Sequence, residues 1–276
     1  MDLYLDPRNL IMKWSKITNQ TCQVRLAYPG QHLASIITGV KGRGTAARGD
    51  DLADGTEVKT CSRADQLSEC NSCKSKVLVW QKECPTCKST DINIKTDSHW
   101  IFSIKSEEEL DLLLNKVPRI IFILFDRKST NTNTIRLRAW EADTKNEYLR
   151  SFFEDYYYNN YSKKLKNNGY PAPCNLHPLK YDFYLMSPKL IFESEIDIDD
   201  RNIKINYWNV ANPDPEKIPT SILNKEELKE LFGPKISELS KDELKETLPF
   251  VPEEKKNELK MRKKIIKTNK QRYRRR

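Results

Sequence analysis

The chain has 276 residues, of which 38% are hydrophobic and 32% charged, and its formal net charge is +9. This length is sufficient to bury a core. No apolar run approaches the length that spans a bilayer, and the start "MDLYLDPRNL" lacks a basic segment followed by an apolar one. We therefore expect a cytoplasmic protein rather than a membrane or secreted one, and the positive charge favours an anionic partner.

The first 40 residues alternate polar and apolar positions at helical spacing. Pro29-Gly30 is expected to divide them into two helices, the second of which, residues 31–40, should pack against a sheet. The stretch "KGRGTAARG" follows and is rich in glycine and basic residues. It lacks the spacing of a nucleotide-binding P-loop, so the sequence predicts a flexible loop whose side chains contact DNA phosphates: Lys41, Arg43 and Arg48.

The next stretch, "GDDLADGTEVKT", places four acids and a lysine around an Asp-Gly pair. Asp54-Gly55 suits a two-residue type I′ turn, which predicts that residues 50–53 and 56–60 form an antiparallel hairpin. In that register Asp50, Glu57 and Lys59 share one face, because side chains alternate along a strand. A bulge in the turn would bring Asp51 to the same face.

Converging carboxylates and an ammonium group suit a Mg²⁺ site, at which the lysine can orient or deprotonate a water that attacks a phosphate. The alternative interpretation is a solvated, charged edge of a hairpin, because most acidic residues lie on the surface.

Seven cysteines in a chain expected to be cytoplasmic favour metal binding over disulfides. Four of them form two CxxC pairs separated by ten residues, and two such pairs can supply four thiolates to one tetrahedral Zn²⁺. Because a site with four cysteine ligands has no open position, we expect the zinc to be structural. The predicted ligands are Cys70, Cys73, Cys84 and Cys87.

Apolar runs at residues 101–104, 119–125 and 134–140 predict core strands, and residues 107–115 predict a helix between them. This alternation indicates an α/β protein with a mixed sheet flanked by helices, with Glu57 and Lys59 on its second strand. The aromatic stretch at residues 152–161 is interpreted as helix core rather than as a platform for base stacking.

Three further residues could bind DNA. His99, in "DSHW", could contact a phosphate or position water, or it could be an ordinary packing or capping residue. Arg136 and Arg138 lie two apart on a predicted strand, so both point the same way, toward base edges or toward solvent.

The positive charge is concentrated in the tail, residues 255–276, which contains twelve basic residues and one acid. Subtracting this local +11 from the total of +9 leaves −2 for the rest of the chain. The tail is interpreted as an arm that binds nucleic acid without reading its sequence, or as a solubilising terminus.

The stretch "GVKGRGTAARGDDLADGTEVKTCSRADQ", followed by "CNSC", "CPTC" and "DSHW", resembles restriction endonucleases of the MamI type over about residues 28–143. These enzymes belong to the PD-(D/E)xK nuclease superfamily. The resemblance implies a prokaryotic, Mg²⁺-dependent type II enzyme that cuts both strands of a specific duplex DNA site as a homodimer.

It also places Glu57 and Lys59 at the ExK positions of the superfamily signature. The seven-residue spacing to Glu57 favours Asp50 over Asp51 as the first acid. Some relatives carry a helical Glu as an additional metal ligand, and Gln31 is the candidate for that position here.

Two other functions fit part of the sequence: a non-enzymatic zinc-ribbon protein that binds DNA, and a repair or junction-resolving nuclease of the same fold. The fold we expect is a PD-(D/E)xK core with an inserted zinc ribbon, built on the four paired cysteines, and a basic C-terminal tail. Its expected divisions are the N-terminal helices and catalytic hairpin (1–69), the zinc ribbon (70–89), the remainder of the core (90–168), a region for dimerisation or DNA binding (169–254) and the tail (255–276).

Overall fold

A five-stranded mixed sheet forms the centre of the computed structural model, which describes residues 1–18, 20, 22–44, 50–95, 97–127 and 133–209. The strand order is β1-β6-β7-β9-β10. Strand β1 pairs with β6 in parallel, and the other neighbours are antiparallel. The strands are Glu57–Ser62 (β1), Arg119–Arg127 (β6), Thr134–Asp143 (β7), Lys189–Asp197 (β9) and Ile203–Trp208 (β10).

Both faces of the sheet are covered, which explains the continuous apolar run of β6. Ile120, Phe122 and Leu124 pack into one core cluster, and Ile121 and Ile123 pack into the other. The predictions of a mixed sheet flanked by helices, and of strands at 119–125 and 134–140, are confirmed.

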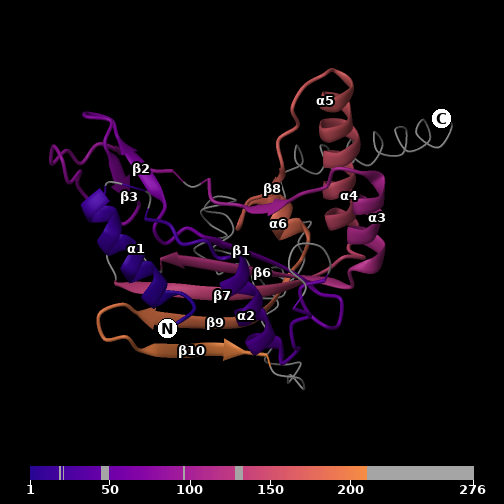
Figure 1. Ribbon diagram of the computed structural model, residues 1–276, viewed down its shortest axis with the longest axis horizontal. Coiled ribbons are helices and arrows are strands. Elements are labelled where there is room, and N and C mark those ends of the chain that lie inside the picture. Colours follow the sequence, from indigo (N-terminus) through magenta and orange to yellow (C-terminus); the bar gives the residue numbers. More distant parts are fainter. Residues whose placement is uncertain (19, 21, 45–49, 96, 128–132, 210–276) are drawn as a thin grey trace, which may run out of the picture.

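Helices α1 (Leu5–Thr18) and α2 (Ala27–Thr38) cover one face of this sheet, as Figure 1 shows. The helical segments on the other face include the aromatic stretch, whose Phe153, Tyr157 and Tyr158 are buried, so its interpretation as helix core is confirmed. These segments are α3 (Glu107–Asp111), η1 (Leu112–Lys116), α4 (Glu147–Asp155), η2 (Tyr156–Tyr161), α5 (Ser162–Lys166) and α6 (Tyr181–Leu185).

Helix α2 begins at Ala27, before the Pro29-Gly30 pair that was expected to separate two helices. That expectation is wrong because both residues lie in the first turn, where the missing N–H of a proline costs no helical hydrogen bond. Gly30 also allows a close approach: a Cβ atom at this position would lie 1.8 Å from Thr60 Oγ1 on β1. The absence of a side chain at Gly30 thus lets α2 lie directly against β1.

Two small sheets accompany the main one. Strand β5 (Trp100–Phe102) pairs with β8 (Cys174–Leu176), so the run at 101–104 forms a strand outside the main sheet. Residues 67–93 form the second, which we call the cysteine module: strands β2 (Leu67–Cys70), β3 (Lys76–Leu78) and β4 (Ile92–Asn93) in the order β3-β2-β4.

Within the part of the chain that the structure describes, no helix is long and apolar enough to cross a membrane. The basic tail, Arg48 and residues 210–254 of the region expected to serve dimerisation or DNA binding lie outside the described residues.

Candidate active site and cysteine cluster

Glu57 and Lys59 lie on β1, an edge strand of the main sheet. They point to the same side as buried Cys61, while Val58 points into the core on the α2 side. Lys59 Nζ is 2.6 Å from Glu57 Oε1 and 5.2 Å from the centre of the Phe102 ring on β5. The Glu57–Lys59 pair is therefore partly shielded from water and sits at an accessible edge.

The predicted hairpin between residues 50–53 and 56–60 does not form. The N–H groups of Asp51 and Leu52 both donate to the carbonyl oxygen of Thr56, which closes a loop instead of a strand ladder. The segment before Asp54 pairs with residues 41–43: the Arg43 N–H donates to the Asp51 carbonyl, and the Ala53 N–H to that of Lys41.

The hydrophobic core explains this difference. The hairpin register places Leu52 opposite Glu57, on the polar face, whereas the structure buries Leu52 completely with Val58. The predicted type I′ turn does not form either: Gly55 adopts a φ of 89° but Asp54 does not have a positive φ, and the Gly55 N–H donates to the Leu52 carbonyl, which centres the turn on residues 53 and 54. Consequently Glu57 and Lys59 lie on the first strand of the sheet, and not on its second as expected.

The loop brings Asp51 to the start of β1. One carboxylate oxygen, Oδ2, accepts the Val58 N–H at 2.7 Å, and Oδ1 accepts a hydrogen bond from Gln31 Nε2. Burial and the nearby Glu57 carboxylate raise the pKa of Asp51, although these hydrogen bonds and Lys59 act in the opposite direction. Asp51, Glu57 and Lys59 thus form one cluster, which we call the acidic cluster.

Asp50 forms an ion pair with the preceding loop. Its Oδ2 atom lies 2.9 Å from Arg43 Nη1, on the loop that precedes it. The hairpin register that favoured Asp50 over Asp51 is absent, and Asp51 lies near Glu57 through a loop rather than through the bulged hairpin of the alternative. Lys41 and Arg43 are exposed on this loop, close in sequence to the acidic cluster.

Gln31 reaches Asp51 because the Gly30–Thr60 contact sets α2 against β1. The sequence offered only a weak indication of this role, the lack of an acid in residues 31–49. Phe102 beneath Lys59 was not identified, because nothing in the sequence shows that β5 crosses β1.

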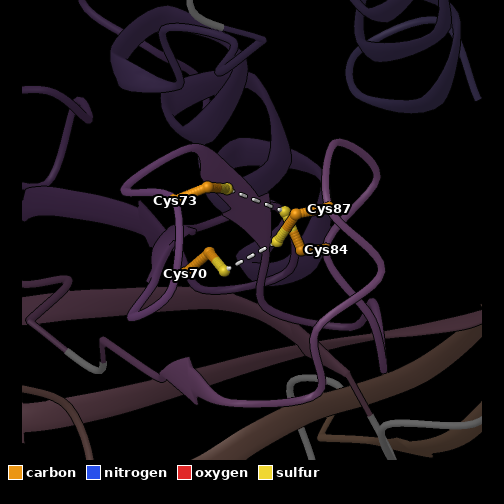
Figure 2. Close-up of side chains that lie close together, drawn as sticks. All are labelled: Cys70, Cys73, Cys84 and Cys87. Carbon is orange, nitrogen blue, oxygen red and sulfur yellow. Dashed lines mark hydrogen bonds between the residues drawn. The ribbon is translucent and has the colours of Figure 1, made fainter.

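The four paired cysteines meet in the cysteine module, as Figure 2 shows. Their Sγ atoms all lie within 4.8 Å of one another; the Cys70–Cys87 and Cys73–Cys84 pairs are separated by 3.6 and 3.5 Å. A tetrahedral zinc ion with Zn–S bonds of about 2.3 Å holds its sulfur atoms about 3.8 Å apart. The cluster thus has the donor set and approximate size of a zinc site.

The two CxxC loops have the same backbone geometry. In each, the residue after the second cysteine has positive φ and donates its N–H to the carbonyl of the first, at 2.9 Å for both Lys74 and Lys88. The N–H of Cys73 lowers the pKa of the Cys70 thiol, and the N–H of Cys87 lowers that of Cys84, whereas the neighbouring thiols raise the pKa of Cys87. Because thiolates are the form that binds zinc, the shared backbone geometry favours metal binding at Cys70 and Cys84.

Comparison with known proteins identifies the family of the chain. The family model of MamI restriction endonucleases matches residues 13–225, most of the chain. The chain belongs to the MamI restriction endonuclease family. It is 26% identical over 229 residues to the type II restriction enzyme MamI of Microbacterium ammoniaphilum, covering 77% of this chain and 66% of that enzyme. No solved structure gives a significant match.

Not all of the residues predicted to bind DNA lie at the acidic cluster. His99 Nδ1 lies 2.6 Å from the Asp97 carbonyl oxygen, and its ring contacts His177 edge-on, as expected of a packing histidine. The histidine therefore has the environment of the packing alternative, and a role at phosphate stays a prediction.

Arg136 and Arg138 share one face of β7, as predicted, but both bind Asp126 on β6. Arg136 donates to both Asp126 oxygens at 3.0 Å, and Arg138 Nη2 donates to one of them at 2.6 Å. The side chain of Arg138 is only 3% exposed. The expectation that Arg138 faces base edges or solvent is therefore wrong: the arginine neutralises a buried carboxylate.

Proposed function

We propose that this protein is a Mg²⁺-dependent type II restriction endonuclease that hydrolyses one phosphodiester in each strand of a specific duplex DNA site. Its membership of the MamI family supports a nuclease. The observation that carries the proposal is the acidic cluster, because two neighbouring carboxylates, one with a raised pKa, suit a divalent cation. The chain spans about two thirds of the length of its MamI relative, so its activity is inferred from its own residues.

Asp51 and Glu57 would hold the Mg²⁺ ion, with Gln31 orienting Asp51 through its amide. When bound, the ion would neutralise charge on the scissile phosphate and lower the pKa of a bound water. Lys59 would orient or deprotonate the attacking water, and Phe102 limits the movement of its ammonium group. In this proposal Asp51, and not Asp50, is the first acid of the signature.

Cutting both strands requires two such centres, since each chain offers one acidic cluster among its described residues. A homodimer with twofold symmetry would present two clusters to opposite strands of a palindromic or interrupted palindromic site. The exposed loop residues Lys41 and Arg43 would contact phosphates near the cut, as proposed also for Arg48.

Incubation of the purified protein with plasmid DNA tests the proposal. We expect discrete fragments with Mg²⁺, intact plasmid with EDTA, and no cleavage by the Glu57→Gln variant. Glu83→Gln, which changes an exposed acid in the cysteine module, is the matched control and should cut normally. DNA that stays intact with every divalent metal would reject the nuclease and leave a protein that only binds DNA.

We also propose that the cysteine module is a zinc ribbon whose metal is structural and takes no part in hydrolysis. The four convergent thiols and the paired loops support this assignment. Elemental analysis should find one zinc per chain, and Cys84→Ser should lower the thermal stability of the protein, since metal binding contributes to folding. A control change, Cys22→Ser at a cysteine outside the two CxxC pairs, should leave the zinc content unchanged.

A further inference from the structure

A second polar site lies at the end of the main sheet away from the acidic cluster. It is a pocket of about 500 Å³ between helix α1, the cysteine module and the ends of β6 and β7. Figure 1 shows α1 below β2 and β3 at this end of the sheet. Among the described residues that line the pocket, none is acidic and four are basic: Arg8, Lys13, Lys16 and Arg127.

The floor of this pocket carries more positive than negative charge. The buried carboxylate of Asp65 accepts hydrogen bonds from Arg8 Nη2 at 2.7 Å and from Arg127 Nη2 at 3.3 Å. Two guanidinium groups around one carboxylate give these three side chains a net charge of +1. Burial also lowers the pKa of Arg127, which means that its environment disfavours the positive charge and that a nearby anion would stabilise it.

Trp80 of the cysteine module holds Arg127 in place. Its indole Nε1 donates to Asp65 Oδ1 at 3.3 Å, and its ring lies 5.1 Å from the Arg127 guanidinium carbon. Arginines fixed in this way are preorganised for phosphate oxygens, because their donors need not be ordered again on binding.

The rim of the pocket is open and follows a helix. Lys13 and Lys16 lie on the same face of α1, one turn apart, and both are exposed. Positive charge that extends along a helix suits a polyanion that passes over the site better than a small ion enclosed in a cavity.

We propose that this pocket binds a backbone phosphate of duplex DNA, at a position remote from the phosphate that is cut. The choice of DNA as the ligand rests on the proposed function. Glu57 lies level with Ile120 in the parallel β1–β6 pair, and Arg127 follows seven residues later. At about 3.3 Å per residue this separates the two sites by about 23 Å along the strand direction. That distance corresponds to about seven base pairs of B-DNA, so the contact would fix the register of the duplex on the protein.

The test is the affinity for a labelled duplex in EDTA, where no metal-dependent cleavage occurs, measured over a range of salt concentrations. Lys13→Glu/Lys16→Glu should weaken binding at least about tenfold and make the plot of log K against log salt less steep by one to two units, roughly one for each lost phosphate contact. The matched control is Lys105→Glu/Lys145→Glu, which alters two exposed lysines outside the pocket by the same net charge. We expect the control to weaken binding by less than about twofold.

Equal weakening by the two double variants would overturn the proposal, because it would show only a general effect of net charge. A rise in the melting temperature of wild-type protein with inorganic phosphate, lost in Lys13→Glu/Lys16→Glu while DNA affinity stays unchanged, would also overturn it and indicate a site for free phosphate. The binding measurement does not depend on cleavage. If the protein cuts no plasmid, the proposed nuclease activity is rejected, but the comparison of the two double variants still shows whether the pocket binds DNA.

Discussion

Two aspartates of this protein, Asp126 in the main sheet and Asp51 at its edge, have opposite surroundings. Asp126 is buried between Arg136 and Arg138, and the two arginines keep its pKa below the usual value although burial raises it. Burial and a second carboxylate, Glu57, raise the pKa of Asp51, and the hydrogen bonds that it accepts from a neutral amide and a backbone N–H only partly oppose this.

The difference distinguishes an ion pair that holds the structure together from a group prepared for a ligand. Asp126 has its compensating charges within the fold, so it requires nothing further. Lys59 is the cation that the described residues place beside Asp51 and Glu57, and a divalent cation would supply further positive charge. Perturbed carboxylates of this second kind are concentrated at functional sites.

Replacement of Asp126 should give the largest change. Asp126→Ala leaves Arg138 buried without its carboxylate, which should lower the free energy of unfolding by about 3–5 kcal/mol. Urea denaturation followed by circular dichroism measures the loss. Asp2→Ala, at an exposed position, should stay within about 0.5 kcal/mol of wild type. A loss below about 1 kcal/mol for Asp126→Ala would show that the ion pairs contribute little.

Asp51→Asn should have the opposite profile, with cleavage lost and the fold retained. Removing a metal ligand should reduce the rate of plasmid cleavage by more than the roughly 10- to 100-fold typical of residues that only support a ligand. The asparagine of this variant can keep both hydrogen bonds if the Gln31 amide flips, because its oxygen then accepts the Val58 N–H and its NH₂ group donates to Gln31. Asp50→Asn is the control, and we expect it to cut at a rate close to wild type. The reverse result would identify Asp50 as the first acid.

The contrast between these aspartates also shows what the sequence could reveal. The proximity of Glu57 and Lys59, the convergence of the four cysteines and the buried strands were predictable, because each depends on a short local pattern. The position of Asp51 near Glu57 was not, because it depended on Leu52: the hydrophobic core takes up this side chain, and a loop forms in place of the expected hairpin. Arg138 was misjudged because no motif links it to its partner Asp126, which lies on the preceding strand β6.

Gln31 offers a smaller change within the same site. Gln31→Ala removes the amide that holds Asp51 Oδ1, so the carboxylate can rotate away from Glu57. We expect cleavage to fall about 10- to 100-fold, with higher Mg²⁺ concentrations recovering part of the loss. His32→Ala, at the next and exposed position of α2, should cut normally. If excess Mg²⁺ recovers no activity, Gln31 acts on something other than the metal ligand.

The smallest expected effect is a difference in how stability depends on pH. A carboxyl group whose pKa is raised in the folded state does not reduce stability at pH values below its unfolded pKa of about 4. It destabilises the fold as the pH rises toward its pKa in the folded state. In EDTA, the free energy of unfolding of Asp51→Asn should therefore equal that of wild type at acidic pH and exceed it at higher pH. Asp126→Asn should show the opposite trend, because a lowered pKa contributes stability above pH of about 4 that is lost on acidification.

Denaturation at several pH values measures both differences, and Mg²⁺ should reverse the first one. The ion stabilises only the folded protein that binds it, by RT ln(1 + [Mg²⁺]/Kd), so wild type should gain stability that Asp51→Asn does not. The control is Asp182→Asn, at a position remote in sequence from Asp51 and Asp126. The difference in stability between this variant and wild type should stay the same when Mg²⁺ is added. Wild type that is more stable than Asp51→Asn at neutral pH in EDTA would contradict the assignment, since Asp51 would then already have its charge compensated within the fold, as Asp126 does.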